Sequence, residues 1–278
     1  MRLSSSKVVA EIIESLKPVA EPLKVEQVVI GLFYTGVRLS GGWGGVAYTP
    51  HEWIVESLCC PELQGRMPLT GKLSGMKAVD AMMLAQGGNL LLRAVGVAAI
   101  NAASAPILFR ENVYEVEYDA DALKGVELRR DDRVVMIGAF KPYLQTLREK
   151  GVKLTVYEKN PALLKELGLK EPETRLEDSL READLVIVTG SAFVASNIDE
   201  ILLADLSSSR EVIVVGPSSS MVPDPLFKHG VTALGGLRIT SPEKMLQVVA
   251  EAGGTKSLLK YAGRKFLVRR KQSYSRLS

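Results

Sequence analysis

Four runs of apolar residues in the second half of this chain limit what it can fold into. They are Val134–Gly138, Leu154–Glu158, Leu185–Ser191 and Val212–Ser220, and each ends in a short polar or glycine-containing turn. Near-continuous apolar runs are typical of parallel strands buried on both faces. The runs alternate with helical patterns, which indicates a doubly wound parallel sheet with right-handed crossovers. Ligands of such sheets bind beyond the carboxyl ends of the strands, and we expect a site there.

The first half has a different order of elements. An apolar stripe predicts a helix from Ser6 to Leu16, with Pro18 just past its end. Residues 25–49 are rich in β-branched and aromatic residues with glycine between them, which predicts two or three antiparallel strands. Residues 74–86 and 89–104 then read as two helices. The second is apolar almost all round and rich in Ala and Gly, so we expect it to be deeply buried.

Strands followed by helices make an α+β unit, whereas the second half alternates strands and helices. The fold class is therefore α/β, with a Rossmann-like doubly wound sheet preceded by a smaller α+β domain. We divide the chain into four parts: the α+β domain at 1–105, a connection at 106–130, the Rossmann-like domain at 131–268 and a basic tail at 269–278.

Composition excludes several classes of protein. The hydrophobic fraction is 46% and the charged fraction 24%, as in soluble globular proteins. The only two cysteines are adjacent, so they do not form the framework of a secreted disulfide protein. The N-terminus lacks a secretory apolar region, and we see no apolar run of membrane-spanning length. These features predict a cytoplasmic protein without membrane contact.

The charge distribution is uneven. From Lys256 onward eight residues are basic and none is acidic, although the net charge is only +3. Such a segment is most often a solvated terminus. No aromatic interleaving or nucleic-acid motif accompanies it, so nucleic acid is not an expected partner.

The turn after the first run does not match a dinucleotide site. Such a site needs G-x-G-x-x-G, because bare backbone must approach a pyrophosphate. Here Gly138 is followed by Ala139, Phe140 and Lys141, which disfavours NAD or FAD. Lys141 contacts an anion or remains an exposed lysine. Glu158 ends the next run, where an acid accepts hydrogen bonds from the ribose of nucleotides or S-adenosylmethionine. Glu158 reads equally well as a glutamate in solvent.

Polar residues also follow the third and fourth runs. Hydroxyls and free N–H groups at such turns bind anions or carboxylates, and they also serve as ordinary helix caps. The candidate ligand-binding residues here are Thr189, Gly190, Ser191, Asn197, Gly216, Pro217 and Ser218.

A metal site in the first half has a weak basis. His51, Cys59 and Cys60 lie within ten residues of one another. Adjacent cysteines do not converge easily on one ion, and no C-x-x-C or H-E-x-x-H spacing occurs. A surface histidine beside a buried cysteine pair is the more common arrangement.

The segments VVMIGAF, YEKNP, ADLVIVTGSAFVASNIDEIL, EVIVVGPSSSMVPDPLF and HGVTALGG occur in this order. Together they resemble a family described as "putative heavy-metal chelation". The stretches GLFYTGVRLSGGWGGVAYTP and LLRAVGVAAINAAS resemble its companion domain, which is similar to the enolase N-terminal domain.

The resemblance implies a Rossmann-like domain packed on an enolase-N-like domain, with a site in the cleft between them and a role in handling metals or metal-bearing cofactors. It adds Asn101 to the site and also places Gly138, Glu158, Thr189, Gly190, Asn197, Pro217 and Ser218 there.

These patterns leave three functions open. The first is a binding protein that takes a small anionic or metal-bearing ligand. The second is a transferase that uses an adenosyl or nucleotide cofactor such as S-adenosylmethionine. The third is a metal-handling protein that binds a transition metal through His51, Cys59 and Cys60. The apolar segment at 90–103 is a candidate seam for a homodimer or for internal packing.

Overall fold

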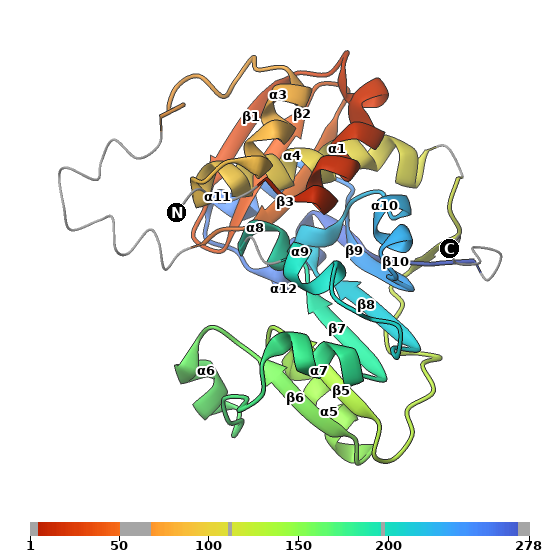
Figure 1. Cartoon of the computed structure of the whole chain (residues 1–278). Coiled ribbons are helices and arrows are strands. Elements are labelled where there is room, and N and C mark those ends of the chain that lie inside the picture. The colour runs from red at the N-terminus through yellow and green to blue at the C-terminus, as the bar shows by residue number, and fades with distance from the viewer. Residues whose placement is uncertain (1–4, 51–67, 111–112, 196–197, 272–278) are drawn as a thin grey trace.

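A sheet forms the second half of the chain, as expected, and it has seven strands (Figure 1). The computed structural model describes residues 5–50, 68–110, 113–195 and 198–271. The strand order is β4-β10-β9-β8-β7-β5-β6. The strands of this sheet are β4 Val116–Tyr118, β5 Arg133–Ile137, β6 Lys153–Tyr157, β7 Leu185–Thr189, β8 Glu211–Val215, β9 Ala233–Ile239 and β10 Gly263–Arg269.

The five strands from β9 to β6 are parallel, and β10 and β4 add antiparallel pairs at one edge. The order β6-β5-β7-β8-β9 reverses direction between β5 and β7, which is a topological switch point. Helices cover both faces, so the doubly wound prediction is confirmed. The helices of this half are α5 Lys141–Glu149, α6 Pro161–Glu166, α7 Leu176–Glu182, α8 Ala192–Ala195, α9 Ile198–Leu202, α10 Asp224–Lys228, α11 Pro242–Ala250 and α12 Thr255–Tyr261, with the 3₁₀ turn η3 Pro217–Ser219.

The first half forms the expected smaller α+β part. Its three-stranded antiparallel sheet contains β1 Val25–Ile30, β2 Tyr34–Leu39 and β3 Trp43–Tyr48. The helices of this half are α1 Lys7–Ala20, α3 Ala78–Met83 and α4 Leu90–Phe109, with the 3₁₀ turn η2 Leu84–Gln86. The side chain of Ser6 caps α1, and Pro18 lies inside the helix rather than beyond it as expected. Leu16 and Ala20 are fully buried, and their packing holds the last turn.

Helix α4 is the central element of the first half. Almost every residue from Leu91 to Pro106 is buried, as predicted from its composition. It continues through Pro106 to Phe109, so the expected domain limit at residue 105 falls within it. By length and composition alone this helix could span a membrane, which corrects our reading of the sequence. Because 83% of that apolar window is buried inside the protein, its hydrophobicity is explained by packing within one chain.

The last helices of the chain return to the first half. Met245, Leu246 and Val249 of α11 pack with Val46 of β3 in one hydrophobic cluster. The three-stranded sheet therefore lies between α4 on one face and α11 on the other. The basic C-terminal segment contains regular elements, namely α12 and the strand β10, which ends at Arg269.

Candidate functional site

A cavity of about 630 Å³ lies at the carboxyl ends of the parallel strands. Its walls come from the turns after β5, β7 and β8, from the middle of β9 and β10, and from the segment after β4. Tyr34 of β2 and Tyr48 of β3 line it from the first half, and α12 contributes Thr255, Lys256 and Leu259. We call this space the main cavity. It occupies the place that the strand pattern predicts for a ligand.

The turns after β5 and β7 meet closely at the switch point. Gly138 has a φ of +84°, which favours glycine, and a Cβ atom there would lie 2.8 Å from Cβ of Thr189. Gly190 approaches η3 in the same way, because its Cβ would lie 2.8 Å from the backbone nitrogen of Ser219. Neither glycine lines the main cavity. Their role in the structure is to let neighbouring loops approach one another.

Thr189 and Ser191, two residues with hydroxyl side chains, line the main cavity. Their oxygen atoms are 3.1 Å apart, and the backbone N–H of Ser191 donates to Thr189 Oγ1 at 3.3 Å. A hydroxyl carries one donor and two acceptor positions, so this pair can still bond a ligand. Both residues lie at the carboxyl end of a strand, where the sequence predicts candidate ligand-binding residues.

The glycine–proline–serine turn after β8 contributes only part of its polar groups. Gly216, Pro217 and Ser218 line the main cavity. The hydroxyl oxygen of Ser219 lies 2.8 Å from the carbonyl oxygens of both Gly216 and Gly235, and Ser220 donates to the Pro217 carbonyl. Two of the three serine hydroxyls in this turn therefore hold the turn itself. Ser218 Oγ accepts a hydrogen bond from the Tyr48 N–H at 2.8 Å, which joins the two halves of the chain.

Asn101 lies behind the cavity wall and does not line it. Its side chain is 2% exposed, and Nδ2 donates to the carbonyl oxygens of Val46 at 2.8 Å and Ser218 at 3.1 Å. Its Oδ1 is buried and has no hydrogen-bond partner in the described part of the chain. Asn101 therefore fastens α4 to β3 and η3 and positions the wall that carries Ser218.

Glu158 and Lys141 also lie outside the cavity wall. The two carboxylate oxygens of Glu158 accept the backbone N–H groups of Ala139 and Asn160, each at 2.9 Å. Lys141 pairs with Glu166 at 2.7 Å on the surface. Asn197, His51, Cys59 and Cys60 lie outside the described residues. The assignment of these four residues to a site stays a prediction from the sequence.

No group of three His, Cys, Asp or Glu side chains that could hold a metal ion occurs among residues 5–50, 68–110, 113–195 and 198–271. The walls of the main cavity are rich in hydroxyl, aromatic and lysine side chains instead. They do not fit a tightly bound transition metal, which needs converging imidazole, thiolate or carboxylate ligands. We therefore assign no resident metal to the main cavity.

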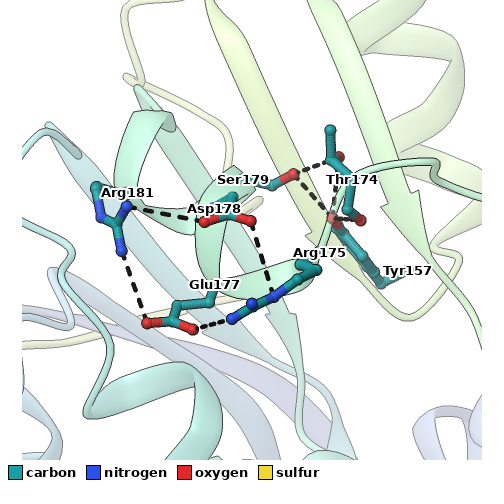
Figure 2. A network of polar contacts seen from close by, with 7 residues as sticks. All are labelled: Tyr157, Thr174, Arg175, Glu177, Asp178, Ser179 and Arg181. Atoms are coloured by element: carbon teal, nitrogen blue, oxygen red, sulfur yellow. Dashed lines mark hydrogen bonds and ion pairs between the residues drawn. The ribbon is translucent and has the colours of Figure 1, made fainter.

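A second hollow of about 520 Å³ lies between α7 and α9. Figure 2 shows the polar network beside it, in which Arg175 and Arg181 each pair with both Glu177 and Asp178. Asp199, on the wall of this hollow, accepts the backbone N–H groups of Lys7 and Val8 at the start of α1. The charges here mainly satisfy one another, so the main cavity is the better candidate.

The sequence patterns do not identify the aromatic residues that line the main cavity. Phe140 is named there only because it follows Gly138 in a turn that lacks the glycines of a dinucleotide site. Tyr34, Tyr48 and Tyr143 line the cavity and lie in different elements. Burial raises the pKa of Tyr143 to about 12, and the nearby charge of Asp121 adds to this effect. Burial also raises the pKa of Tyr34, against a smaller lowering by its hydrogen bond with Thr255. Both tyrosines remain neutral at physiological pH.

The shifted pKa of Tyr143 predicts a loss of stability at high pH. Its folded pKa of about 12 exceeds the unfolded value of about 10, so its contribution is complete below pH 10 and disappears as pH rises toward 12. Tyr143→Phe should therefore flatten the fall in unfolding free energy between pH 9 and 11.5, as measured by urea denaturation. The Tyr261→Phe variant, at a 55% exposed ring, is the control. Equal slopes in all three proteins would contradict the assignment.

The fold and the cavity define a class: a two-part α/β protein with a pocket at the ends of a Rossmann-like sheet. A family called DUF364 and described as "Putative heavy-metal chelation" matches residues 121–268, and DUF4213, with the same description, matches residues 13–104. The chain belongs to the DUF364 family, and the sequence resemblance is confirmed.

Two solved structures of this family share the fold. A protein of unknown function from Pyrococcus horikoshii is 25% identical, with a TM-score of 0.75 and coverage of 95% of this chain and 100% of that chain. A protein of unknown function from Desulfitobacterium hafniense is 24% identical, with the same TM-score and coverages. A search of curated proteins gives no match. The comparisons therefore identify the fold and the family and name no ligand.

Proposed function

We propose that this chain is a cytoplasmic binding protein that takes a small anionic molecule, alone or complexed with a metal ion, in the main cavity. The observation that carries the proposal is the position of this cavity at the carboxyl ends of the parallel strands. Its volume of about 630 Å³ falls within the range of small-molecule sites. In this proposal a metal is part of the cargo, which agrees with the description of the family as chelating.

Three kinds of group support capture of an anion. Thr189 and Ser191 supply hydroxyls at the end of β7. Gly216 and Ser218 lie in the turn after β8, where the φ of +136° at Gly216 favours glycine. Lys256 and Lys265 bring positive charge to the cavity wall. Apolar surfaces between these groups exclude water, which strengthens each hydrogen bond to the ligand.

The alternative of a transferase with an adenosyl cofactor has less support. That reading depends on Glu158 accepting the ribose hydroxyls. Glu158 instead accepts N–H groups from the turns after β5 and β6, and it does not line the main cavity. Its carboxylate joins these two loops by hydrogen bonds. We therefore keep binding as the proposed function and assign no reaction.

The test is to close the cavity without unfolding the protein. Val215 lies at the end of β8 on the cavity wall, and Val215→Phe should fill part of the space. Native mass spectrometry of freshly purified protein should show a bound small molecule in the wild type and at least ten-fold less in this variant. Val113→Phe makes the same substitution at a 53% exposed position and should leave occupancy unchanged.

Two outcomes would overturn the proposal. One is a folded wild-type protein that carries no small molecule and shows no thermal shift with a panel of carboxylates, phosphates and their nickel or iron complexes. The other is equal occupancy in Val215→Phe and wild type, with circular dichroism showing that both are folded. The second result would place the bound molecule elsewhere on the chain.

A further inference from the structure

The main cavity collects an unusual share of the aromatic side chains of the chain. The sequence contains 8 tyrosines and 6 phenylalanines, and aromatic residues make up only 6% of it. Three of those tyrosines and two of those phenylalanines line this one cavity. Polar hydroxyls alone would serve a compact anion such as phosphate. The concentration of rings indicates that the cavity is built for a larger, flatter ligand.

Two aromatic pairs come from opposite halves of the sequence. Tyr34 and Tyr48 are directly paired across β2 and β3, so their side chains leave the sheet on the same face. Phe140 and Tyr143, before and within α5, have ring centroids 5.7 Å apart with planes tilted by 32°. Aromatic rings attract other aromatic rings in stacked or tilted arrangements at such distances. Both pairs line the main cavity.

The cavity also has unneutralised positive charge at its wall. Lys256 of α12 and Lys265 of β10 are exposed and form no ion pair within the described part of the chain. Arg264 pairs with Asp119 at 2.7 Å, which neutralises one of the two acids on the wall. The other acid, Asp121, accepts the Leu123 N–H at 2.9 Å and keeps its negative charge, so the wall carries two lysines against one carboxylate without a cationic partner in the described part of the chain. We refer to Lys256 and Lys265 as the wall lysines.

We infer that the ligand of the main cavity is a planar aromatic molecule with a negatively charged substituent, such as an aromatic carboxylate. The aromatic pairs contact its ring and the wall lysines bind its anionic group. The hydroxyls of Thr189 and Ser191 remain for polar atoms of the ring system. This inference rests on the proposed function, which requires an anionic ligand but does not require an aromatic one.

Three probes with one carbon skeleton test the inference by isothermal calorimetry on the full chain. They are 2-naphthoate, the neutral 2-naphthamide and the saturated decahydro-2-naphthoate. We expect 2-naphthoate to bind about ten-fold more tightly than either of the others, because each of these lacks one of the two interactions. Raising the salt concentration should weaken 2-naphthoate more than 2-naphthamide.

Matched variants assign the effect to residues. Lys256→Gln and Lys265→Gln should each weaken 2-naphthoate about three- to five-fold and leave 2-naphthamide unchanged, as for exposed charge pairs. Lys260→Gln, on the same helix but outside the cavity wall, is the control. Tyr34→Leu should weaken both aromatic probes about five-fold, whereas Tyr34→Phe keeps the ring and should bind as wild type. Comparing the two Tyr34 variants distinguishes the contribution of the ring from that of the hydroxyl, which is hydrogen-bonded to Thr255 at 2.7 Å.

Each contrary result has a definite meaning. Equal binding of the saturated acid removes the aromatic part of the inference, and equal binding of the amide removes the anionic part. If native mass spectrometry finds a bound molecule but none of the three probes binds, the inference fails while the proposed function stands. If no molecule is found and no probe binds, both fail.

Discussion

Asn101→Asp is expected to destabilise the protein by about 3 kcal/mol or more at pH 7, because it puts an uncompensated charge in a buried place. The amide nitrogen of Asn101 now donates to the carbonyl oxygens of Val46 and Ser218. A carboxylate of the same shape would place an oxygen, which can only accept, against these two carbonyl oxygens. Protonation at pH 5 should restore part of the loss, since a neutral acid can donate one hydrogen bond. Urea denaturation at both pH values measures the effect.

The same substitution at Asn89 is the control. Asn89 caps the start of the same helix, where its Oδ1 accepts the N–H groups of Leu91 and Leu92. Asn89→Asp keeps that acceptor and adds a negative charge at a helix N-terminus, so stability should stay the same or rise slightly. If Asn101→Asp proved as harmless as Asn89→Asp, the donor role of Asn101 would be wrong.

Gly45→Ala is expected to cost about 3 kcal/mol, although it adds a single methyl group. A Cβ atom at this position of β3 would lie 2.3 Å from the Ala98 carbonyl oxygen and 2.4 Å from the Ala102 nitrogen. Both are backbone atoms of α4, so no side chain can rotate out of the way. The sheet and the helix would have to separate along a fully buried surface. A shift of the urea midpoint measures the loss.

Gly88→Ala provides the comparison for this second variant. A Cβ atom at Gly88 would have no neighbour within 4 Å. The unfolding free energy of the Gly88→Ala protein should therefore differ from that of the wild type by no more than about 0.5 kcal/mol. Similar midpoints for the two variants would show that β3 and α4 can move apart at little cost, contrary to their close approach here.

The parallel part of the fold could be predicted because its information is local. Buried parallel strands such as β7 read as continuous apolar runs. The antiparallel strand β10 was missed, since its basic residues suggested a solvated terminus. Phe266 and Val268 of β10 are buried, while Arg264 and Arg269 bind the segment after β4. That bond partner is 145 residues away from Arg264, and no local pattern reveals it.

Part of the cavity wall was predictable for the same reason. The residues on the cavity wall that the sequence predicts are Thr189, Ser191, Gly216, Pro217 and Ser218. They could be predicted because strand ends are visible in the sequence. Glu158 was placed there by a general rule for nucleotide-binding folds, and only the structure shows its carboxylate holding two loop amides. Tyr34 and Lys256 were not expected, since they enter the cavity from a different sheet and from a late helix.

The return of α11 to the outer face of the three-stranded sheet has a consequence for synthesis of the protein on the ribosome. One face of that sheet packs against α4, but the other meets Met245, Leu246 and Val249, which are made more than two hundred residues after β1 begins. A nascent chain ending before residue 242 would leave Val46 and its neighbours facing water. The N-terminal part therefore completes its folding only late in translation, and shortened chains should depend on chaperones.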